Sequence, residues 1–356
     1  MNDGAGMINR QEPEGRAFGH EGALTRDGWR IAVVVPGYRV RAQVLKVINA
    51  IGPEVCRIYV VDDCCPENSG QYVAENCVDP RVVIIRHATN QGVGGAVKSG
   101  YRRALDENMD VVVKIDGDGQ MDPSLLPLFV GPIIRGEADY TKGNRFFYLE
   151  GLAGMPRMRL LGNAALSFAT KLSSGYWQIF DPTNGYTAIE ARVLAHLPLE
   201  KISDRYFFES DMLFRLNLLR AYPVDIPMSA VYADERSNLK IGRVIGEFFW
   251  KNGRNLLKRI FYNYFLRDMN PASVELLGGG ALFLFGVVFG GMNWMEALVS
   301  GRQTPLGTIM LAALPVLVGV QLLLAFLAFD IANSPRRAIQ NNLGLVGVRC
   351  EIKWIP

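Results

Sequence analysis

Short apolar runs rich in β-branched residues alternate with stretches of helical periodicity over the first part of the chain. The runs are "IAVVVP" (31–36), "RIYVVDD" (57–63), "RVVIIRH" (81–87) and "DVVVKID" (110–116). Between them, stretches such as "RAQVLKVINAI", "GAVKSGYRRALDEN" and "PSLLPLFVGPII" carry apolar residues at helical spacing. This alternation predicts an α/β domain with a mainly parallel sheet and helices on both faces. In such a sheet, ligands bind beyond the carboxyl ends of the strands.

Two windows near the C-terminus are almost purely apolar and carry no charge. They are "LLGGGALFLFGVVFGGM" (276–292) and "LGTIMLAALPVLVGVQLLLAFLAF" (306–329). At ~1.5 Å per residue, helices of this size approach a hydrocarbon thickness of ~30 Å. The windows therefore predict two transmembrane helices, with buried core helices as the alternative.

The charges around these windows predict their orientation. Lys and Arg cluster before the first window and follow the second, whereas the loop between them has only Arg302 beside Glu296. The positive-inside rule therefore places the α/β domain and both termini in the cytoplasm. No N-terminal apolar segment resembles a signal peptide.

The stretch "IGRVIGEFFWKNGRNLLKRIFYNYFLRD" (241–268) mixes aromatic and aliphatic residues with regularly placed Lys and Arg. It predicts a basic amphipathic helix in the membrane interface, with its cations on anionic lipid headgroups. Docking against the α/β domain is the alternative.

Overall composition narrows the class of protein. The net charge of +3 and pI of about 8.5 are too mild to indicate nucleic-acid binding. The five cysteines form no CxxC pair, and a cytoplasmic chain keeps them reduced. The three histidines show no ligand spacing, and we assign them no role.

The segment "DGDGQ" (116–120) follows a buried strand and carries two carboxylates at i and i+2. Both side chains of an extended Asp116-x-Asp118 point to one side, so they can meet one hard cation, and Gln120 offers a further oxygen. Oxygen donors of this kind suit Mg²⁺ or Mn²⁺ shared with substrate phosphates. A calcium loop of the EF-hand type is excluded because its twelfth position holds Pro127. A plain Asp/Gly turn is the alternative.

The segment "NQGVGGAVKSGY" (90–101) matches most of the sequence pattern of a phosphate-binding P-loop. That pattern needs Gly immediately before the Lys-Ser pair, but this chain has Val97. The segment therefore predicts the start of a helix whose small residues allow a ligand to approach closely.

In this order and spacing, "VVVPGYRV", "VVDD", "NQGVGGAVKSGY" and "DGDGQMDP" resemble family 2 glycosyltransferases of GT-A fold. The closest subgroup is the polyprenyl-phosphate glycosyltransferases, which include dolichol-phosphate mannose synthase. The resemblance covers residues 30–240, and the interfacial helix with two C-terminal spans extends it to about residue 330.

The resemblance implies a nucleotide-sugar site. Pro36 and Tyr38 match the motif that packs on the base, and the pair Asp62 and Asp63 matches the one that binds base and ribose. The family often continues with Gly-Ser where this chain has Cys64 and Cys65. The remaining donor-side positions are Asn90, Gly92 and Lys98 for the phosphates, and Asp116, Asp118 and Gln120 for the metal.

The resemblance also implies an acceptor side. Arg145 of "KGNR" matches a ligand of acceptor or donor phosphate, and Asp181 of "DPTNGY" matches the functional carboxylate of the acceptor motif. Arg236 and Lys240 of "ERSNLK" match a segment that closes over the diphosphate. Relatives often carry a carboxylate or Arg near the aromatic of the acceptor motif, where this chain has Gly185 and Thr187. "ESD" (209–211) is a second acidic candidate.

The implied activity is inverting transfer of a hexose from a GDP- or UDP-linked sugar to a polyprenyl phosphate, dolichyl or undecaprenyl. Asp118, Asp181 and Arg145 would serve catalysis, and a divalent metal, Mg²⁺ or Mn²⁺, would assist. The partners are the nucleotide-sugar, the lipid acceptor and the bilayer, and the paired spans are a candidate homo-oligomer interface. The expected location is a bacterial inner membrane, and the products would serve cell-envelope glycan or protein glycosylation.

Two other classes stay open. A processive polysaccharide synthase resembles this domain but carries Q-x-x-R-W, and no Arg-Trp pair occurs in the chain. A membrane-anchored nucleotide-binding scaffold would not need the Asp116-x-Asp118 pair. The predicted organisation is a disordered leader (1–29), a catalytic GT-A domain (30–239), an amphipathic helix (240–268), a two-helix transmembrane domain (272–330) and a cytoplasmic tail (331–356).

Overall fold

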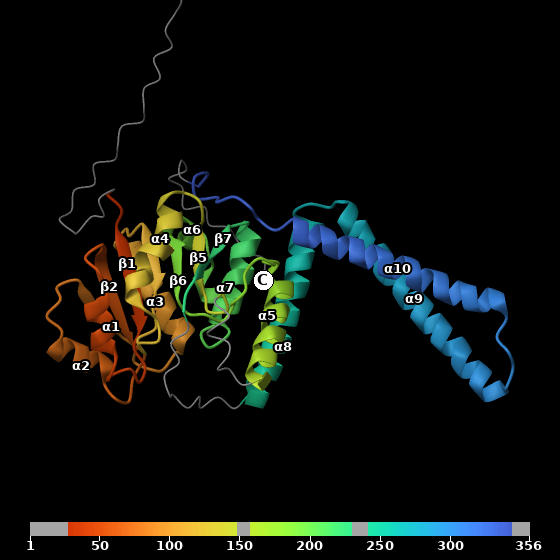
Figure 1. The fold of residues 1–356 in the computed structure, drawn as a ribbon, viewed down its shortest axis with the longest axis horizontal. Helices are drawn as coiled ribbons and strands as arrows, with labels where there is room; N and C mark the ends of the chain where they lie inside the picture. The colour runs from red at the N-terminus through yellow and green to blue at the C-terminus, as the bar shows by residue number, and fades with distance from the viewer. Residues whose placement is uncertain (1–27, 148–156, 230–240, 344–356) are drawn as a thin grey trace, which may run out of the picture.

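The computed structural model describes residues 28–147, 157–229 and 241–343. An α/β domain stands at one end of the molecule, and a long helical hairpin extends from its side (Figure 1). Most of the predicted leader, and the end of the predicted tail, lie outside the described residues.

One seven-stranded sheet organises the domain, in the order β3-β2-β1-β4-β6-β5-β7. The strands β1, β2, β3 and β4 are mutually parallel where they pair, and β5 is parallel to β7. Only β6 runs antiparallel to its neighbours β4 and β5 among the described strands. The predicted mainly parallel sheet is therefore confirmed. The strands are β1 (Ile31–Pro36), β2 (Val55–Asp62), β3 (Val82–Arg86), β4 (Val111–Lys114), β5 (Tyr140–Asn144), β6 (Thr187–Glu190) and β7 (Pro223–Pro227).

Helices cover both faces of the sheet, as the alternating pattern predicts. The domain helices are α1 (Val44–Ala50), α2 (Ser69–Asn76), α3 (Val93–Asp106), α4 (Leu126–Ile134), α5 (Arg157–Ser174), α6 (Ala191–Ala195) and α7 (Phe208–Leu219). Short 3₁₀ turns, η1 (Pro123–Leu125) and η3 (Leu199–Lys201), precede α4 and α7. Side chains of α1, α2 and α4 pack on one face of the sheet, and those of α3, α6 and α7 pack on the other.

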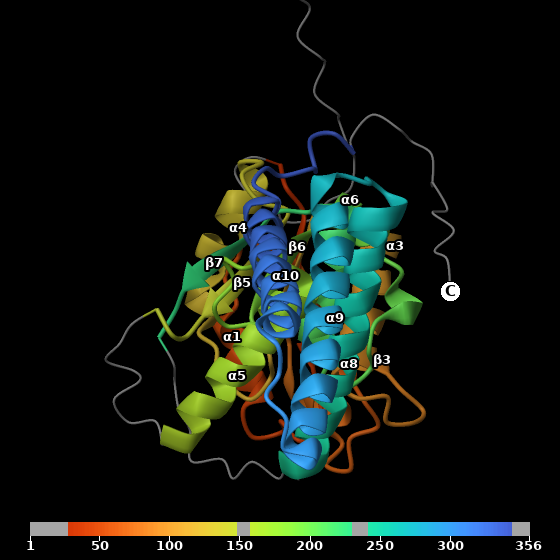
Figure 2. The same ribbon diagram turned by 90° about the vertical axis from the view of Figure 1, so that its right-hand side faces the viewer.

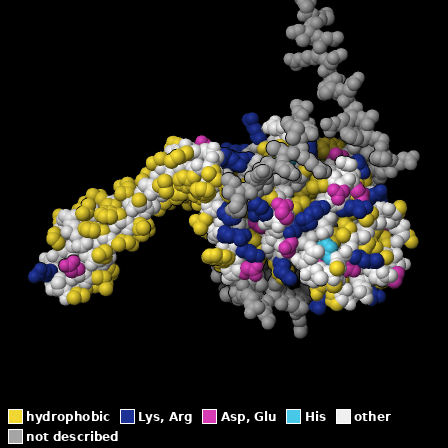
Figure 3. All heavy atoms as spheres, turned by 180° about the vertical axis from the view of Figure 1, so that it is seen from behind, with side chains coloured by type: hydrophobic (Ala, Val, Ile, Leu, Met, Phe, Trp, Pro, Cys, Tyr) yellow, Lys and Arg dark blue, Asp and Glu magenta, His cyan; other side chains and the backbone are white. Residues whose placement is uncertain are grey.

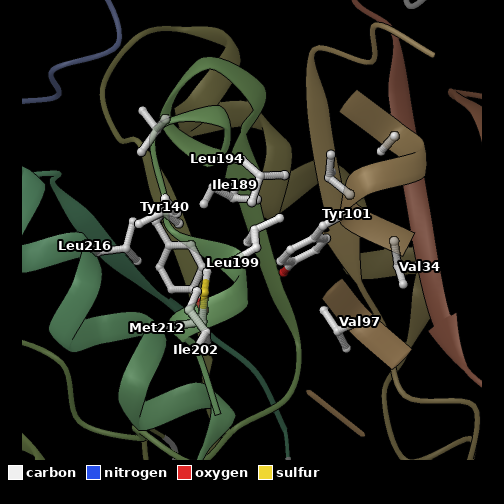
Figure 4. Packing of buried hydrophobic residues seen from close by; sticks show 14 of the residues in the cluster. Val34, Val97, Tyr101, Tyr140, Ile189, Leu194, Leu199, Ile202, Met212 and Leu216 are labelled. Atoms are coloured by element: carbon white, nitrogen blue, oxygen red, sulfur yellow. The ribbon is translucent and has the colours of Figure 1, made fainter. Parts of the chain in front are cut away.

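The core on the α3 and α7 face is closed by aromatic side chains between the sheet and the helices. Tyr101 of α3 and Tyr140 of β5 are buried there with Met212 and Leu216 of α7 (Figure 4). Each such side chain removes apolar surface from water at about 25 cal/mol per Å². This core holds the carboxyl ends of the strands in fixed register.

Two helices lie between the sheet and the hairpin. They are α5 and α8 (Ile241–Phe261), seen from the hairpin side in Figure 2, and a π-helical turn, η4 (Tyr262–Leu266), follows α8. The inner face of α8 is buried through Phe248, Asn252 and Asn255, so the helix docks against the domain. Its outer face exposes Trp250 and Leu257, as an interfacial helix requires. Docking against the domain is therefore confirmed for the inner face, and the position of the outer face in the membrane interface stays a prediction.

The hairpin consists of α9 (Pro271–Ser300) and α10 (Leu306–Ala332), which run side by side (Figures 1 and 2). Both are long and apolar enough to cross a membrane, and only 22% and 11% of their most apolar windows are buried within the chain. Hydrophobic side chains cover the hairpin surface (Figure 3). A core helix of a soluble protein would bury such a surface, so these are membrane helices.

Glycine lets the two hairpin helices touch backbone to backbone. A Cβ on Gly319 of α10 would lie 2.6 Å from the Phe283 nitrogen and 2.9 Å from the Gly279 oxygen of α9. No real side chain fits at such distances, so the crossing needs glycine at this point.

A buried ion pair fixes the hairpin to the domain. Asp330, near the end of α10, receives two hydrogen bonds from the guanidinium of Arg259 on α8, at 2.5 and 3.0 Å. The Tyr264 hydroxyl donates to the same carboxylate at 2.7 Å, and the Trp177 indole donates at 3.4 Å. Asp330 and Arg259 are 5% and 3% exposed. The hairpin is therefore held at a defined angle by a bidentate pair, rather than by a flexible linker.

We predict that Asp330→Ala destabilises the protein by about 3–5 kcal/mol, because it leaves the Arg259 guanidinium buried without its carboxylate. The measurement is the unfolding midpoint of the full chain in detergent. Replacing both partners, as Arg259→Met with Asp330→Leu, should recover much of the loss.

The matched control is Arg135→Ala, which breaks the exposed pair between Arg135 and Glu137. Its midpoint should stay at the wild-type value because exposed pairs contribute little. Equal midpoints for Asp330→Ala and Arg135→Ala would contradict the anchoring role of the buried pair.

Candidate active site

The predicted site residues gather at the carboxyl edge of the parallel strands. Pro36 ends β1, Asp62 ends β2, and Asp116 follows β4 by two residues. Because β2, β1 and β4 are neighbours in the sheet, their carboxyl ends meet at one edge. This is the edge where α/β sheets bind ligands.

A buried lysine that the sequence analysis did not select stands at the centre of this edge. Lys114, the last residue of β4, is 1% exposed. Its ammonium lies 2.9 Å from Asp116 Oδ1 and 3.0 Å from Glu209 Oε1, and it donates to the Gly185 oxygen at 3.2 Å. Burial alone would lower the pKa of Lys114, but Asp116 and Glu209 outweigh burial and raise it above the usual value. The ammonium therefore stays charged, with one acceptor for each of its three protons.

This contact explains why position 185 carries glycine. A Cβ on Gly185 would overlap both Asp116 Oδ2 and Lys114 Nζ. The loop that contains "DPTNGY" is thereby held flat against the strand-end carboxylate. Glu209, from the predicted second acidic segment, reaches the same ammonium from the start of α7.

Arg145 and Asp181, both predicted from the acceptor side, are paired with each other. Asp181 is fully buried, and its two oxygens accept from Arg145 Nε at 2.7 Å and Nη2 at 3.0 Å. The Arg145 side chain keeps 34% of its surface exposed. A bidentate carboxylate orients the guanidinium at the domain surface. Asp181 therefore positions Arg145 in this structure.

A second buried cluster next to this pair carries shifted pKa values. Burial lowers the pKa of Lys142 on β5 to about 8, although Glu209 and Asp181 act in the opposite direction. Burial raises the pKa of Asp225 on β7 to about 6, although a hydrogen bond from the Phe180 amide and the nearby Lys142 lower it. Asn144 donates to Asp225 Oδ2 at 3.1 Å, and Asp225 Oδ1 is buried without a hydrogen bond. Sequence reasoning missed both residues because each lies within an ordinary strand pattern.

The carboxylates of Asp62 and Asp63, at the end of β2, accept hydrogen bonds from backbone amides. Asp62 accepts from the amides of Cys65 and Gly70, each at 2.8 Å. Asp63 accepts from the amides of Gln91 at 2.8 Å and Gly92 at 2.7 Å. Both carboxylates thus shape the loops that follow β2 and β3. Their predicted contacts with base and ribose stay predictions.

The side chain of His87, to which we assigned no role, is 6% exposed and lies beside Asp63. Its Nδ1 lies 2.8 Å from Asp63 Oδ1, and its Nε2 lies 2.8 Å from the hydroxyl of Ser99 on α3. The ring therefore links the end of β2 to α3. The only sequence signal is that His87 directly follows a strand at the same sheet edge.

The predicted phosphate segment is anchored to the loop before α7. Gly92 has φ +93° and precedes α3, and a Cβ there would lie 2.6 Å from the Asp204 oxygen. Lys98 is buried, donates to the Ile202 oxygen at 2.9 Å and pairs with Asp204. Asn90 is exposed and donates to the Asp63 oxygen at 3.2 Å. The structure gives Lys98 a packing role, and its contact with a phosphate stays a prediction.

Tyr38 of the predicted base side and Asp118 of the predicted metal side are at least partly exposed at the same edge. Tyr38 is 42% exposed, whereas Pro36 is buried within β1. Asp118 is partly exposed, and its Oδ1 accepts from the Gln120 amide at 3.0 Å. Arg236 and Lys240 lie outside the described residues.

The chemistry of the donor set fits a hard divalent cation shared with a substrate. Within residues 28–147, 157–229 and 241–343, no three His, Cys, Asp or Glu side chains gather to hold a metal. Asp116 and Asp118 provide two carboxylates, and Mg²⁺ commonly binds through one or two carboxylates with substrate phosphates and water as further ligands. The residues present therefore fit a metal that is completed by a diphosphate.

The sheet order and the position of the carboxylates at the strand ends are those of a GT-A fold. The crystal structure of glucosyl-3-phosphoglycerate synthase from Mycobacterium tuberculosis with Mn²⁺, UDP and phosphoglyceric acid shares this fold. It has a TM-score of 0.50 and 19% identity, and the match covers 67% of this chain and 84% of the synthase.

Sequence comparison matches part of the chain to one family and gives related proteins. Residues 32–197 match the profile of glycosyl transferase family 2. UDP-N-acetylglucosamine–dolichyl-phosphate N-acetylglucosaminyltransferase of Methanococcus voltae is 27% identical over 218 residues, which cover 57% of this chain and 86% of that protein. Undecaprenyl-phosphate mannosyltransferase of Micrococcus luteus is 28% identical over 222 residues, covering 61% and 90%. The chain is a glycosyltransferase with a family 2 domain.

We predict that Gly185→Ala disrupts the site, because the new Cβ must displace the Asp116 carboxylate or the Lys114 ammonium. Transferase activity should fall at least about tenfold, and stability should fall by roughly 1–3 kcal/mol, as for other overpacked positions. Gly253→Ala is the matched control, since a Cβ there meets no atom within 4 Å and alanine favours the helix. Wild-type activity in Gly185→Ala would refute the close packing of the loop that contains Gly185 on Lys114.

We also predict that Asp225→Asn changes the pH dependence of stability. A carboxyl group whose pKa is raised on folding stabilises the folded state most below its unfolded pKa of ~3.9. That contribution is lost as the pH rises through about 6. The amide keeps an oxygen for the Phe180 and Asn144 donors and carries no buried charge.

The stability of Asp225→Asn relative to the wild type should therefore rise between pH 4 and pH 7, by roughly 1–2 kcal/mol after allowance for partial solvent access. Unfolding midpoints of the two proteins across this range test it. A constant difference across the range would mean that Asp225 does not titrate with a raised pKa.

Proposed function

We propose that this glycosyltransferase moves a hexose from a GDP- or UDP-linked sugar to a polyprenyl phosphate, with inversion at the anomeric carbon. The observation that carries the proposal is the rigid junction between the family 2 domain and the apolar hairpin, made by Arg259 and Asp330. Such a junction keeps the domain at the bilayer surface, where a lipid-borne acceptor presents its phosphate. The dolichyl- and undecaprenyl-phosphate transferases among the relatives support the same acceptor class.

In this proposal, Asp116 and Asp118 hold Mg²⁺ or Mn²⁺, and Gln120 lies beside them. The bound metal would offset the negative charge that grows on the departing diphosphate. Tyr38 and Pro36 would line the base side, and Asn90, Gly92 and Lys98 would border the phosphates. The partly exposed Arg145 guanidinium, oriented by Asp181, would bind a phosphate at the same edge.

The reaction breaks the bond between the anomeric carbon and the diphosphate oxygen and forms one to an oxygen of the acceptor phosphate. A phosphate monoester has a second pKa near ~6, so the acceptor is mostly dianionic at neutral pH. Its oxygen is a nucleophile without removal of a proton. Positioning cations therefore matter more than a strong base, which agrees with Asp181 being committed to Arg145.

The proposed arrangement has the domain and both ends of the hairpin in the cytoplasm. Lys and Arg flank the spans on that side, and the connecting loop carries Arg302 beside Glu296 of α9. A bacterial inner membrane suits this topology. We also propose that the paired spans form a homo-oligomer interface. The products would serve cell-envelope glycan synthesis or protein glycosylation.

The decisive test uses membranes that contain the full chain, a panel of radiolabelled GDP- and UDP-sugars, and extraction into organic solvent. Metal-dependent label in the lipid phase is the expected result. Label in insoluble polymer would replace the proposal with a processive synthase, and absence of turnover with every donor would indicate a nucleotide-binding scaffold.

We predict that Asp118→Asn lowers transfer to lipid by about 10²–10³-fold, the usual cost of removing one group that stabilises transition-state charge. Exposed Asp106, at the end of α3, provides the control Asp106→Asn, which should keep wild-type rates. Initial rates at saturating Mg²⁺ or Mn²⁺ measure the effect. An unchanged rate in Asp118→Asn would remove the proposed metal site.

A further inference from the structure

One carboxylate on β7 holds the residues that precede both members of the pair formed by Arg145 and Asp181. Asn144 donates from Nδ2 to Asp225 Oδ2 at 3.1 Å. The backbone amide of Phe180 donates to the same oxygen at 2.9 Å. Each of these two donors directly precedes one member of the pair in the sequence. A single oxygen atom therefore joins the two segments that carry the ion pair.

The Asn144 side chain fixes the backbone on both sides of Arg145. Its Nδ2 donates to Asp225, and its Oδ1 accepts from the Phe146 amide at 2.9 Å. An Asn side chain that bonds to the backbone two residues further on forms a local turn, and Arg145 is the residue inside this turn. Because Asn144 is only 3% exposed, these hydrogen bonds are shielded from water.

The reach of Asp225 follows from the pairing of β5 with β7. The two strands are parallel neighbours in the sheet (Figure 1), with Lys142 opposite Asp225. Asn144 lies two residues beyond Lys142, on the same face of β5. The register of the sheet therefore brings the Asp225 carboxylate to the end of β5, where Arg145 begins the next segment.

A comparison with a second buried carboxylate shows how Asp225 differs from an ordinary anchor. Asp139, before β5, uses both of its oxygens, which accept from the amides of Tyr222, Ile339 and Gln340. Asp225 uses Oδ2 for both of its donors, and its Oδ1 is buried without a hydrogen bond from the described residues. The position of this carboxylate thus serves the junction of two segments at the expense of its own hydrogen bonding.

We propose that Asp225 is a positioning residue of the transferase, which holds the Arg145 guanidinium in the orientation that binds a substrate phosphate. Asp225 acts through the pair of Arg145 with Asp181 and does not touch the substrate. Without Asp225, the two segments lose their shared anchor, and even a small displacement of a positioning group weakens a substrate contact. The inference rests on the proposed function, because that function assigns a phosphate to Arg145.

The test compares the KM values of the two substrates, measured with the full chain in membranes. The substrates are the GDP- or UDP-sugar that the wild type transfers and a short-chain polyprenyl phosphate. Arg145→Gln first identifies the substrate that the guanidinium binds, as the one whose KM rises. Asp225→Ala should raise the KM of that same substrate about tenfold, and the other KM should stay near its wild-type value.

A double variant tests whether Asp225 acts through Arg145. When Arg145→Gln is already present, Asp225→Ala should raise the KM no further, because residues that act on one contact are not additive. Asp225→Asn keeps an oxygen that accepts from Asn144 and Phe180, so this conservative variant should retain the wild-type KM.

The matched control is Asp139→Ala, which removes a fully buried carboxylate from the opposite end of β5. Both alanine variants remove hydrogen bonds from buried groups, so both should lower the unfolding midpoint in detergent. Only Asp225→Ala should also raise the KM, which separates positioning of the guanidinium from general stability.

Three results with an active wild type would overturn the inference alone. They are an unchanged KM in Asp225→Ala, an equal rise of the KM in Asp139→Ala, and independent effects of Asp225→Ala and Arg145→Gln in the double variant. A wild type that transfers no sugar to lipid would instead refute the proposed function, and the inference with it.

Discussion

The active-site edge depends on one buried ammonium that must be paired with negative charge. Lys114 ends β4 inside the protein, where an unpaired charge would cost several kcal/mol. Asp116, Glu209 and the Gly185 carbonyl supply its three partners. They come from the turn after β4, the start of α7 and the loop that contains Gly185. A single electrostatic requirement therefore joins three segments far apart in the sequence into one surface.

The same requirement operates where the domain meets the membrane hairpin. Arg259 and Asp330 are both almost inaccessible, and Tyr264 and Trp177 provide the remaining hydrogen bonds of the carboxylate. Buried ion pairs of this kind contribute specificity of arrangement more dependably than net stability. The pair defines one orientation of α10 relative to α8, and hence one orientation of the strand-end carboxylates relative to the bilayer. Such fixed geometry suits the proposed transfer to an acceptor that is confined to the plane of the membrane.

Local pattern was sufficient to predict most of the architecture. The four predicted strands, the helices between them and the two membrane helices all appear where apolar periodicity indicated them. The strands β5, β6 and β7 were not predicted, and neither was the antiparallel direction of β6. The "TAIE" run of β6 is compatible with a parallel or an antiparallel strand, and only its pairing with β4 and β5 determines that it is antiparallel. The docking of α8 likewise depends on polar side chains, such as Asn252 and Asn255, that periodicity treats as surface.

Many residues of the candidate site were predicted from the sequence, but the contacts between their side chains were not. Motif resemblance selected Asp116, Asp181 and Arg145, and the structure places the latter two in direct contact. Motif resemblance could not show that Lys114 and Glu209 are partners, because these residues are 95 positions apart and meet only through tertiary packing. Nor could it show that the carboxylates of Asp62 and Asp63 accept hydrogen bonds from backbone amides. In each case the missing information is which partner neutralises a buried group, and long-range contacts alone decide that.

The balance of charge at this edge gives a physical reason for the proposed metal dependence. Among the described residues of the part of this edge formed by β4, β5, β7 and the start of α7, the cations are Lys114, Lys142 and Arg145, and the acidic side chains are Asp116, Asp118, Asp181, Asp225 and Glu209. With Asp225 ionised above pH 6, the carboxylates outnumber the cations by two. A surface of that sign repels a nucleoside diphosphate and a phosphate acceptor alike. A divalent cation at Asp116 and Asp118 would cancel the excess, so that both anions could occupy the edge together.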